Sequence, residues 1–589
     1  MSIKLETFYA PNPQPERAVS FLMSANDAAD RFVYPYSTCV YLRGLTDTFD
    51  VDTYYVHSAK VTAASYSPGG RWIASGDECG NLRVWTPQNA EKTTQLEIRP
   101  ISGPILDLTW TEDSAKLSVI GHGANGAYGS VMSSDTGAPM GEVIGHTKPV
   151  NTGCLRPVRP FKFVTAGDDN THVFYKGPPF KFDHSTCDHQ KFVLCARYAP
   201  NGSVYATVGL DGKVFVYDGV SGEKLRVFSF GSGISSISFS PDSTQALVSL
   251  LCGKSLVIKV EDGSVVEEYD FGQDVHNQQC GTLWTKKHKI SISLNGTLNY
   301  LENGKSRSVM GHTCGLSSIA MIPGGFVSAD SLGTVLFRKF KEAPYAVWNP
   351  FRGAPGVKAI CTINNNAQVL VGCADFSLNV LSVEDGSLIR TIKFDKPINA
   401  LLPFGDDVII QTSDSLVLFK NDEFIPIPTS EKVSSAAVSQ ATNEIVYGTK
   451  SGMIFFIDID GSVRGSAKSH DYEVTTISYS HDGSKVATSS NKFDITVWSR
   501  ENLNEPIHTG WRFHSLRINK ILFSKDGNHL ITVSGDRTIR QWSLEKKRKY
   551  VEEKIAHFEG VVSAEWVDDS RIITIGDDSS IRQWIVEMI

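Results

Sequence analysis

A short pattern of β-strands and turns repeats from one end of the chain to the other. Each copy has an apolar strand ending in Ser, Pro, Asp or Gly, a second strand, a tight turn, and a third strand ending in Trp, Tyr or Phe. Clear copies occupy residues 61–85, 192–218, 474–498, 518–542 and 561–584. No long segment keeps a helical period, so the repeat predicts an all-β fold.

The copies follow one another at about 40 to 45 residues, which is the period of a four-stranded WD40 propeller blade. With the weaker copies included, we expect fourteen blades, which begin near Ala18, Val61, Ile105, Val150, Phe192, Ile234, Gln279, Leu316, Val357, Ile398, Val433, Val474, Ile518 and Val561. Fourteen blades in one ring would leave a very wide centre, so we predict two seven-bladed β-propellers. The first is expected to span residues 10–311, and the second residues 312–589 together with residues 1–9.

The two ends of the chain complement each other. The last copy stops at its third strand, residues 581–586, and a strand-like segment, residues 3–9, precedes the first copy. An unpaired third strand would expose a sheet edge, which folded proteins avoid. We therefore predict that the N-terminal strand closes the last blade of the second propeller.

Composition narrows the class of protein. With 41% apolar and 21% charged residues, the chain resembles a soluble globular protein. Its net charge of −7 argues against a general nucleic-acid or anionic-membrane surface. No run of eighteen apolar residues and no signal-peptide pattern is visible. The ten cysteines form no C-x-x-C pair, which predicts reduced thiols rather than disulfides or a zinc site.

Several histidines and aspartates recur at fixed places in the repeat. An Asp stands six residues before the closing aromatic residue at Asp169, Asp211, Asp536 and Asp578. Histidines precede the first strand at His146, His189, His312, His470, His514 and His557. In blades of this type, such residues can hydrogen-bond in buried chains that hold the strands. We therefore interpret His146, Asp169, Asp211, Asp536 and Asp578 as scaffold and not as a catalytic pair.

No motif supports an enzyme or a bound cofactor. Residues 121–126 match G-x-G-x-x-G but lie between two strands and open no helix, so they do not indicate a dinucleotide site. No P-loop, G-x-S-x-G or H-E-x-x-H motif occurs. We expect no catalytic residues, no cofactor and no metal.

The stretch 165–198 carries features that most copies lack. Since Asp169 holds the scaffold position, Asp168 is a surplus acid in the same turn. Phe180 and Phe182 should share one side of the next strand, with Lys181 on the other side, and Phe192 should lie near the face that carries the turn. Two interpretations stay open: both Phe side chains pack between blades, or the rim presents an aromatic and charged patch for a protein partner.

The same stretch resembles the actin-interacting protein 1 family, and the resemblance covers essentially the whole chain. Its most specific pieces are GPPFKF at 177–182, HQKFV at 189–193 and RYAPNGS at 197–203. Supporting pieces are SGDECGNLRVW at 75–85, SGPILDLTW at 102–110 and RPFKFVTAGDDNT at 159–171. A generic WD40 protein would not be expected to share all of them.

The resemblance implies a non-enzymatic protein of the cytoplasm and actin cytoskeleton, built as two seven-bladed propellers. It implies binding to actin filaments (F-actin) decorated with ADF/cofilin, promotion of their severing and disassembly, and effects on filament ends. No nucleic-acid or membrane partner is implied, and we expect a monomer. The family's binding positions match here at Asp168, Lys181, Phe182 and Phe192.

One loop departs from the family pattern. The family often has Gly-x-Gly-Arg-Glu-Arg-Phe-Gly in the third blade, whereas residues 121–129 here contain no acid and are one residue longer. An acidic contact is therefore missing or supplied elsewhere.

Two other functions remain as hypotheses from the sequence. The first is a WD40 scaffold for another cytosolic complex, such as a ubiquitin-ligase or trafficking assembly. The second is an enzyme with a site in a propeller's central channel, which no nucleophile or metal-ligand arrangement in the sequence favours.

Overall fold

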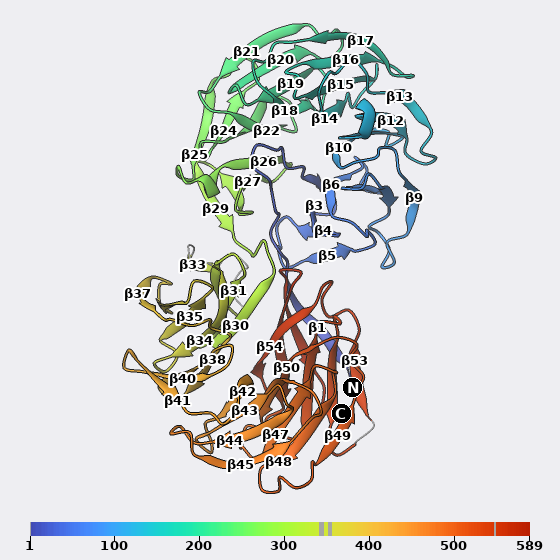
Figure 1. Ribbon diagram of the computed structural model, residues 1–589. Coiled ribbons are helices and arrows are strands. Elements are labelled where there is room, and N and C mark those ends of the chain that lie inside the picture. The colour runs from blue at the N-terminus through green and yellow to red at the C-terminus, as the bar shows by residue number, and fades with distance from the viewer. Residues whose placement is uncertain (1, 341–346, 352–355, 547–548, 589) are drawn as a thin grey trace. The chain divides into compact units, whose positions relative to one another are not determined.

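The repeat folds into four-stranded antiparallel sheets arranged as propeller blades (Figure 1). The computed structural model describes residues 2–340, 347–351, 356–546 and 549–588. Its strands form 14 such sheets, and the chain divides into two compact units. We call Asn12–Thr313 the N-terminal propeller, and Met1–Pro11 with Cys314–Ile589 the C-terminal propeller. The prediction of an all-β chain with two seven-bladed propellers is confirmed.

The N-terminal propeller contains blades 1 to 7. Blades 1 and 2 consist of β2 (Ser24–Asn26), β3 (Arg31–Tyr36), β4 (Cys39–Gly44), β5 (Val51–Tyr54), β6 (Val61–Tyr66), β7 (Ile73–Asp77), β8 (Leu82–Trp85) and β9 (Thr94–Ile98). Blades 3 and 4 consist of β10 (Ile105–Trp110), β11 (Lys116–Gly121), β12 (Gly129–Ser133), β13 (Pro139–Glu142), β14 (Val150–Leu155), β15 (Lys162–Gly167), β16 (His172–Lys176) and β17 (Lys181–Thr186). Blades 5 and 6 consist of β18 (Val193–Tyr198), β19 (Val204–Gly209), β20 (Lys213–Asp218), β21 (Lys224–Ser229), β22 (Ile234–Phe239), β23 (Gln245–Leu250), β24 (Lys254–Lys259) and β25 (Val265–Asp270). Blade 7 consists of β26 (Gln279–Trp284), β27 (Lys289–Ser293), β28 (Leu298–Glu302) and β29 (Lys305–Val309).

The C-terminal propeller contains blades 8 to 14. Blades 8 and 9 consist of β30 (Leu316–Ile322), β31 (Gly325–Asp330), β32 (Val335–Lys339), β33 (Val347–Phe351), β34 (Val357–Ile363), β35 (Gln368–Cys373), β36 (Ser377–Ser382) and β37 (Leu388–Lys393). Blades 10 and 11 consist of β38 (Ala400–Phe404), β39 (Asp407–Gln411), β40 (Leu416–Lys420), β41 (Glu423–Ile427), β42 (Val433–Ser439), β43 (Glu444–Thr449), β44 (Met453–Ile457) and β45 (Val463–Lys468). Blades 12 and 13 consist of β46 (Val474–Tyr479), β47 (Lys485–Ser490), β48 (Ile495–Ser499), β49 (His508–Trp511), β50 (Ile518–Phe523), β51 (His529–Ser534), β52 (Ile539–Ser543) and β53 (Tyr550–Glu553). Blade 14 consists of β54 (Val561–Asp568), β55 (Arg571–Gly576) and β56 (Ile581–Val586), with β1 (Ile3–Tyr9) as its fourth strand.

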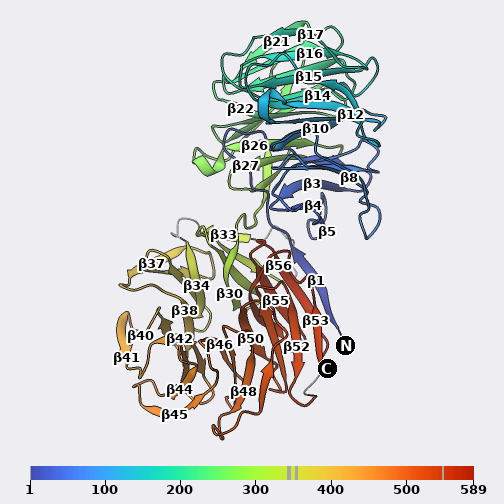
Figure 2. The same ribbon diagram turned by 45° about the vertical axis from the view of Figure 1, so that its right-hand side comes forward.

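The N-terminal strand closes the C-terminal propeller, as the sequence predicts. β1 pairs antiparallel with β56, with Ile3 opposite Val586 and Tyr9 opposite Ile581 (Figure 2). The ring is then complete, since β54 of blade 14 lies against β30 of blade 8. β1 therefore covers the strand edge that β56 would otherwise expose.

The first blade begins later than expected. Its first strand starts at Ser24, so the prediction of a strand from Ala18 is wrong. The preceding apolar segment closes the N-terminal ring instead, because the Phe21 amide donates to the Cys280 carbonyl oxygen of blade 7 at 2.9 Å. Leu22 is also buried in the core of this propeller.

The hydrophobic core lies in layers between neighbouring blades. Alternating residues of one central strand supply two layers: in β15, Phe163 packs toward blade 3 and Val164 toward blade 5. This follows from the two-residue period of strands that are buried on both faces. Helix is confined, among the described residues, to two single turns, η1 (Ala124–Gly126) and η2 (Val275–Asn277), and neither could span a membrane.

In several blades, a buried chain of hydrogen-bonded side chains connects the loop before the blade to the blade's central strands. In each chain a His Nδ1 lies 2.9–3.2 Å from an Asp carboxylate, and its Nε2 lies 2.8–2.9 Å from a Thr or Ser hydroxyl. The six chains are His57–Asp77–Ser75, His146–Asp169–Thr165, His189–Asp211–Thr207, His470–Asp494–Thr488, His514–Asp536–Thr532 and His557–Asp578–Thr574. The scaffold interpretation of His146, Asp169, Asp211, Asp536 and Asp578 is confirmed. Asp77 and Asp494 were not predicted, because they stand eight and four residues before Trp85 and Trp498 rather than six.

Deleting one buried side chain of β1 should destabilise the C-terminal propeller. Ile3 is 6% exposed and packs in the core beside Trp584 and Val586, whereas Leu5 is 47% exposed. We expect Ile3→Ala to lower the free energy of unfolding by about 2 kcal/mol, and Leu5→Ala to lower it by less than about 0.5 kcal/mol. Urea denaturation followed by circular dichroism measures both. Equal effects of the two variants would contradict the proposed role of β1 in closure.

The buried histidines make stability depend on pH. Burial lowers the pKa of His57, His514 and His557, and lowers that of His172 to about 3. Below about pH 6.5 the unfolded chain therefore binds protons that the folded chain does not. We expect the midpoint of urea unfolding to fall steadily from pH 7 to pH 5. A midpoint that stays constant or rises over this range would contradict the neutral, buried state of these rings.

Candidate protein-binding site

Two adjacent acids in the β15–β16 turn have different environments. The Asp169 carboxylate is 4% exposed and accepts hydrogen bonds from His146, from the Thr171 hydroxyl and from the Thr147 amide. Burial raises its pKa, but these hydrogen bonds outweigh burial, so the pKa lies well below its usual range. Asp168 is half-buried and takes no part in these hydrogen bonds. The turn therefore uses one acid to hold the blade and presents the other.

Asp168 lies where blade 4 meets blade 5. Its backbone amide donates to the Pro149 carbonyl oxygen at 2.9 Å, which joins the turn to the loop entering β14. Its carboxylate accepts from Asn151 Nδ2 at 2.8 Å, and the same nitrogen donates to the Val193 carbonyl oxygen at 3.0 Å. Asn151 thereby links Asp168 to the start of β18, directly after Phe192.

Phe192 is exposed at this junction. Its ring is 41% exposed, and Lys148 Nζ lies 5.9 Å from the ring centroid. Its carbonyl oxygen accepts from the Leu210 amide at 3.0 Å, so the backbone is held to the β19–β20 turn of blade 5. Asp168, Phe192 and Lys148 thus form an acidic, aromatic and basic group on the face that carries the turns.

The two phenylalanines of the GPPFKF segment differ in burial. Phe180 is 4% exposed, packs in the core between blades 3 and 4, and donates its amide to the Met140 carbonyl oxygen at 2.7 Å. It precedes β17, so the prediction that Phe180 and Phe182 share one side of a strand is wrong. Phe182 is 43% exposed, so it does not pack fully between the blades.

The Phe182 ring rests on the loop that enters blade 4. A Cβ added to Gly145 would lie 2.8 Å from Phe182 Cε2, and Gly145 has φ +99°, so only glycine fits there. Gly145 directly precedes His146, which bonds to Asp169. The loop on which the Phe182 ring rests is therefore the loop that is hydrogen-bonded to the turn carrying Asp168, although Phe182 itself comes from the outermost strand.

Lys181 does not join this group. It lies opposite Lys176 in the β16–β17 pair, at the end of the blade away from the β15–β16 turn. Phe182 and Lys181 point to opposite sides of β17 because they are consecutive strand residues. Of the four predicted positions, the structure therefore brings Asp168 and Phe192 together through Asn151 and puts Lys181 at the other end of the blade. The Phe182 ring lies against Gly145 of the loop entering blade 4.

Sequence reasoning missed three residues that shape this surface. Ile144 is 55% exposed and precedes the glycine under Phe182, while Asn151 and Lys148 contact Asp168 and Phe192. An aliphatic residue just before a Gly-His pair is the sequence signal that could have identified Ile144. Nothing in the sequence indicates that Asn151 bridges two blades.

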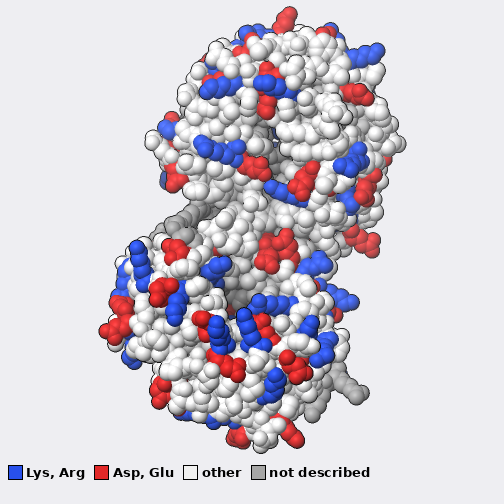
Figure 3. All heavy atoms as spheres, viewed as in Figure 1, with Lys and Arg blue, Asp and Glu red and all other residues white. Residues whose placement is uncertain are grey.

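The loop that departs from the family pattern lies in blade 3. Residues 121–129 join β11 to β12 through η1, and the Ala124 amide donates to the Ser102 hydroxyl at 2.8 Å. On the face seen in Figure 3, basic and acidic side chains are interspersed over both units rather than forming one field of a single sign.

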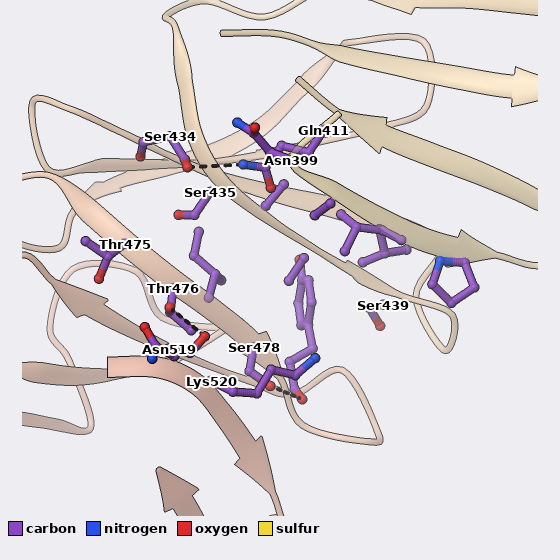
Figure 4. Close-up of a pocket in the computed structure, with 18 of the residues that line it drawn as sticks. Asn399, Gln411, Ser434, Ser435, Ser439, Thr475, Thr476, Ser478, Asn519 and Lys520 are labelled. Carbon is purple, nitrogen blue, oxygen red and sulfur yellow. Dashed lines mark hydrogen bonds between the residues drawn. The ribbon is translucent and has the colours of Figure 1, made fainter. Parts of the chain in front are cut away.

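A large cavity of about 1060 Å³ opens at the centre of the C-terminal propeller and is lined by β38, β42, β46 and β50 (Figure 4). Its polar side chains hold neighbouring blades together. Ser434 Oγ donates to the Val474 carbonyl oxygen at 2.7 Å, and Asn519 Nδ2 donates to the Val561 carbonyl oxygen at 2.7 Å. In the described part of the chain no His, Cys, Asp and Glu side chains group as metal ligands would.

The fold and these blade-holding chains define a WD-repeat β-propeller protein. The family model for the WD domain, G-beta repeat, matches residues 50–86, 181–218, 461–499 and 504–543.

Comparison with curated proteins identifies the family. WD repeat-containing protein 1 from Gallus gallus is 30% identical over 85% of this chain and 85% of its own length. Actin-interacting protein 1 from Drosophila melanogaster is 30% identical over 87% of this chain and 86% of its own length. WD repeat-containing protein 1 from Rattus norvegicus is 38% identical over 55% of each chain. The chain belongs to the family of WD repeat-containing protein 1 and actin-interacting protein 1.

Substitution of each acid in the β15–β16 turn should show that Asp169 has a structural role and that Asp168 does not. Asp169→Ala leaves a buried His without its carboxylate, and we expect a loss of about 3 kcal/mol in the free energy of unfolding. Asp168→Ala removes one hydrogen bond at a half-exposed position, and we expect a loss of about 1 kcal/mol or less. Urea denaturation compares them. A larger loss for Asp168→Ala would overturn the assignment of roles.

Proposed function

We propose that this protein promotes the disassembly and severing of actin filaments decorated with ADF/cofilin, with an additional effect at filament ends. The observation that carries the proposal is that Asp168 and Phe192 lie together and Phe182 is exposed on the same GPPFKF-containing stretch, in a chain of this family. The relative from Drosophila melanogaster is named for its interaction with actin. The propeller scaffold and the family names point to a non-catalytic protein.

The surface has the composition of a protein-binding site. The Asp168 carboxylate is fixed near Phe192 by backbone and Asn151 hydrogen bonds, and the exposed Phe182 lies on the outermost strand of the same blade. Exposed aromatic residues on a rigid support serve as anchors at interfaces, because they bury a large area with little loss of side-chain entropy. In the proposal Phe182 and Phe192 are the apolar anchors, Asp168 makes a charged contact, and Lys181 makes one of opposite sign.

The mechanism we propose is mechanical. A rigid propeller binds a cofilin-deformed or broken filament more tightly than an intact one. That difference in affinity shifts the equilibrium toward fragments by linkage, without a chemical step. The proposal places the protein in the cytoplasm on actin structures, acting as a monomer with no cofactor.

Removing two of these contacts should weaken binding to decorated filaments. For Asp168→Ala with Phe182→Ala we expect at least a 30-fold loss of affinity, which corresponds to about 2 kcal/mol for an aromatic anchor. The assay is co-sedimentation of the full chain with cofilin-decorated actin filaments at a range of concentrations. Circular dichroism and a thermal unfolding curve show whether the variant is folded.

A matched control comes from blade 6 of the same propeller. Glu261 and Val265 are an exposed acid and an exposed aliphatic residue, and the Glu261→Ala/Val265→Ala variant should bind like wild type. If wild type binds and the Asp168→Ala/Phe182→Ala variant binds equally well, the site assignment fails. If wild type itself does not bind decorated filaments, the proposed function fails, and a partner in another assembly is favoured.

A further inference from the structure

Three lysines form a row across the outer strands of blade 4. Lys162 of β15 lies opposite Lys176 of β16, and Lys176 lies opposite Lys181 of β17. Residues directly opposite one another in an antiparallel sheet point to the same face, and neighbouring strands are about 4.8 Å apart. The row therefore crosses three strands at the end of the blade away from Asp168.

Such a row is unfavourable for the fold by itself, because like charges directly opposite one another destabilise a strand pair. Other hairpins of this chain use opposite charges at the same place. Glu302 faces Lys305 in blade 7, and Lys420 faces Glu423 in blade 10. Blade 4 thus differs from these two hairpins, where the paired charges attract each other.

The row is only partly neutralised. Lys176 Nζ lies 2.7 Å from a carboxylate oxygen of Asp183, which also accepts from His184. Lys162 Nζ lies 5.8 Å from the centroid of the Phe174 ring, and its pKa is lowered by burial and by Lys176. Within the described residues, no carboxylate lies at salt-bridge distance from Lys162 or Lys181. Three positive charges against one carboxylate leave the row basic on a chain that is acidic in total.

The row is accessible from outside the ring. Lys176 and Lys181 are exposed, and β17 is the outermost strand of its sheet, so one edge of it has no strand partner. Phe182 follows Lys181 and projects from the other side of β17, where its ring is 43% exposed. A partner that covers this edge would meet an aromatic anchor on one side and the lysine row on the other.

We propose that Lys162, Lys176 and Lys181 together bind an acidic protein segment, with carboxylates of the partner lying along the row. Lysines offer separate point charges rather than the planar fork of arginine, which suits several single carboxylates. Lys162 sits against Phe174, inward of the exposed strand, where flexible acidic side chains can reach it and a flat lipid surface cannot. An apolar contact beside the charges also fits a protein partner.

Under the proposed function this segment belongs to the decorated actin filament, and this part of the inference rests on that function. Lys162 and Lys176 then extend the contact of Lys181 along the rim. The binding of an acidic peptide to the row does not rest on it, so the two can be tested separately.

The first experiment uses a fluorescein-labelled octaglutamate peptide and the full chain, with fluorescence anisotropy at low ionic strength. We expect wild type to bind, with affinity that falls as salt rises. The Lys162→Gln/Lys176→Gln variant, which leaves Lys181 intact, should lose at least 10-fold in affinity. The control is Lys259→Gln, because Lys259 ends the third strand of blade 6 opposite Gln245 and not opposite a lysine.

The second experiment measures co-sedimentation of the same variants with cofilin-decorated filaments. We expect at least a 5-fold loss for Lys162→Gln/Lys176→Gln and no change for Lys259→Gln. If wild type binds the peptide but not the filaments, the proposed function is wrong, and the lysine row is still supported as a binding site for acidic segments.

Three results would overturn the inference. One is a double variant that binds the peptide as wild type does. Another is a wild type that does not bind the peptide at all. The third is row-dependent binding to phosphatidylserine vesicles without peptide binding, which would assign the row to lipid instead.

Discussion

The hydrogen-bonded chain from Thr165 through His146 to Asp169 fixes the geometry on which the candidate site depends. It ties the loop entering blade 4 to the β15–β16 turn in a buried setting. Asp169 makes the buried hydrogen bonds, and the neighbouring Asp168 instead faces the junction with blade 5. The same loop supplies Gly145, on which the Phe182 ring rests. One structural interaction therefore positions both a charged and an aromatic contact.

The two ends of blade 4 carry different arrangements of charge. At one end Asp168 lies near Phe192 and Lys148, where acid, base and aromatic ring are grouped. At the other end the three lysines lie in a row with one compensating aspartate. Phe182 follows Lys181 on the outermost strand. A partner that covers the rim would thus meet alternating chemistry along one blade, which gives specificity more than affinity alone.

Much of the fold could be predicted from the sequence because the repeat encodes it locally. Alternating apolar strands, Asp-containing turns and closing aromatic residues specify each blade, and the unpaired last strand predicts the position of β1. The segment after Ala18 was misassigned because an apolar run looks the same whether it pairs within its own blade or closes the ring. That each propeller folds as a domain of its own, with a boundary near residue 311, stays a prediction.

The candidate site could be predicted only in part. The surplus acid Asp168 and the exposed rings of Phe182 and Phe192 follow from spacing and resemblance, but the burial of Phe180 depends on a contact with blade 3 that no local pattern shows. The lysine row could not be predicted from the sequence either, because strand register, and not distance along the sequence, brings Lys162 beside Lys176. The measurement that tests the central claim most directly is real-time imaging of single actin filaments with the wild-type chain. We expect frequent breakage only when cofilin is also present. Breakage at the same rate with and without the chain on cofilin-decorated filaments would contradict it.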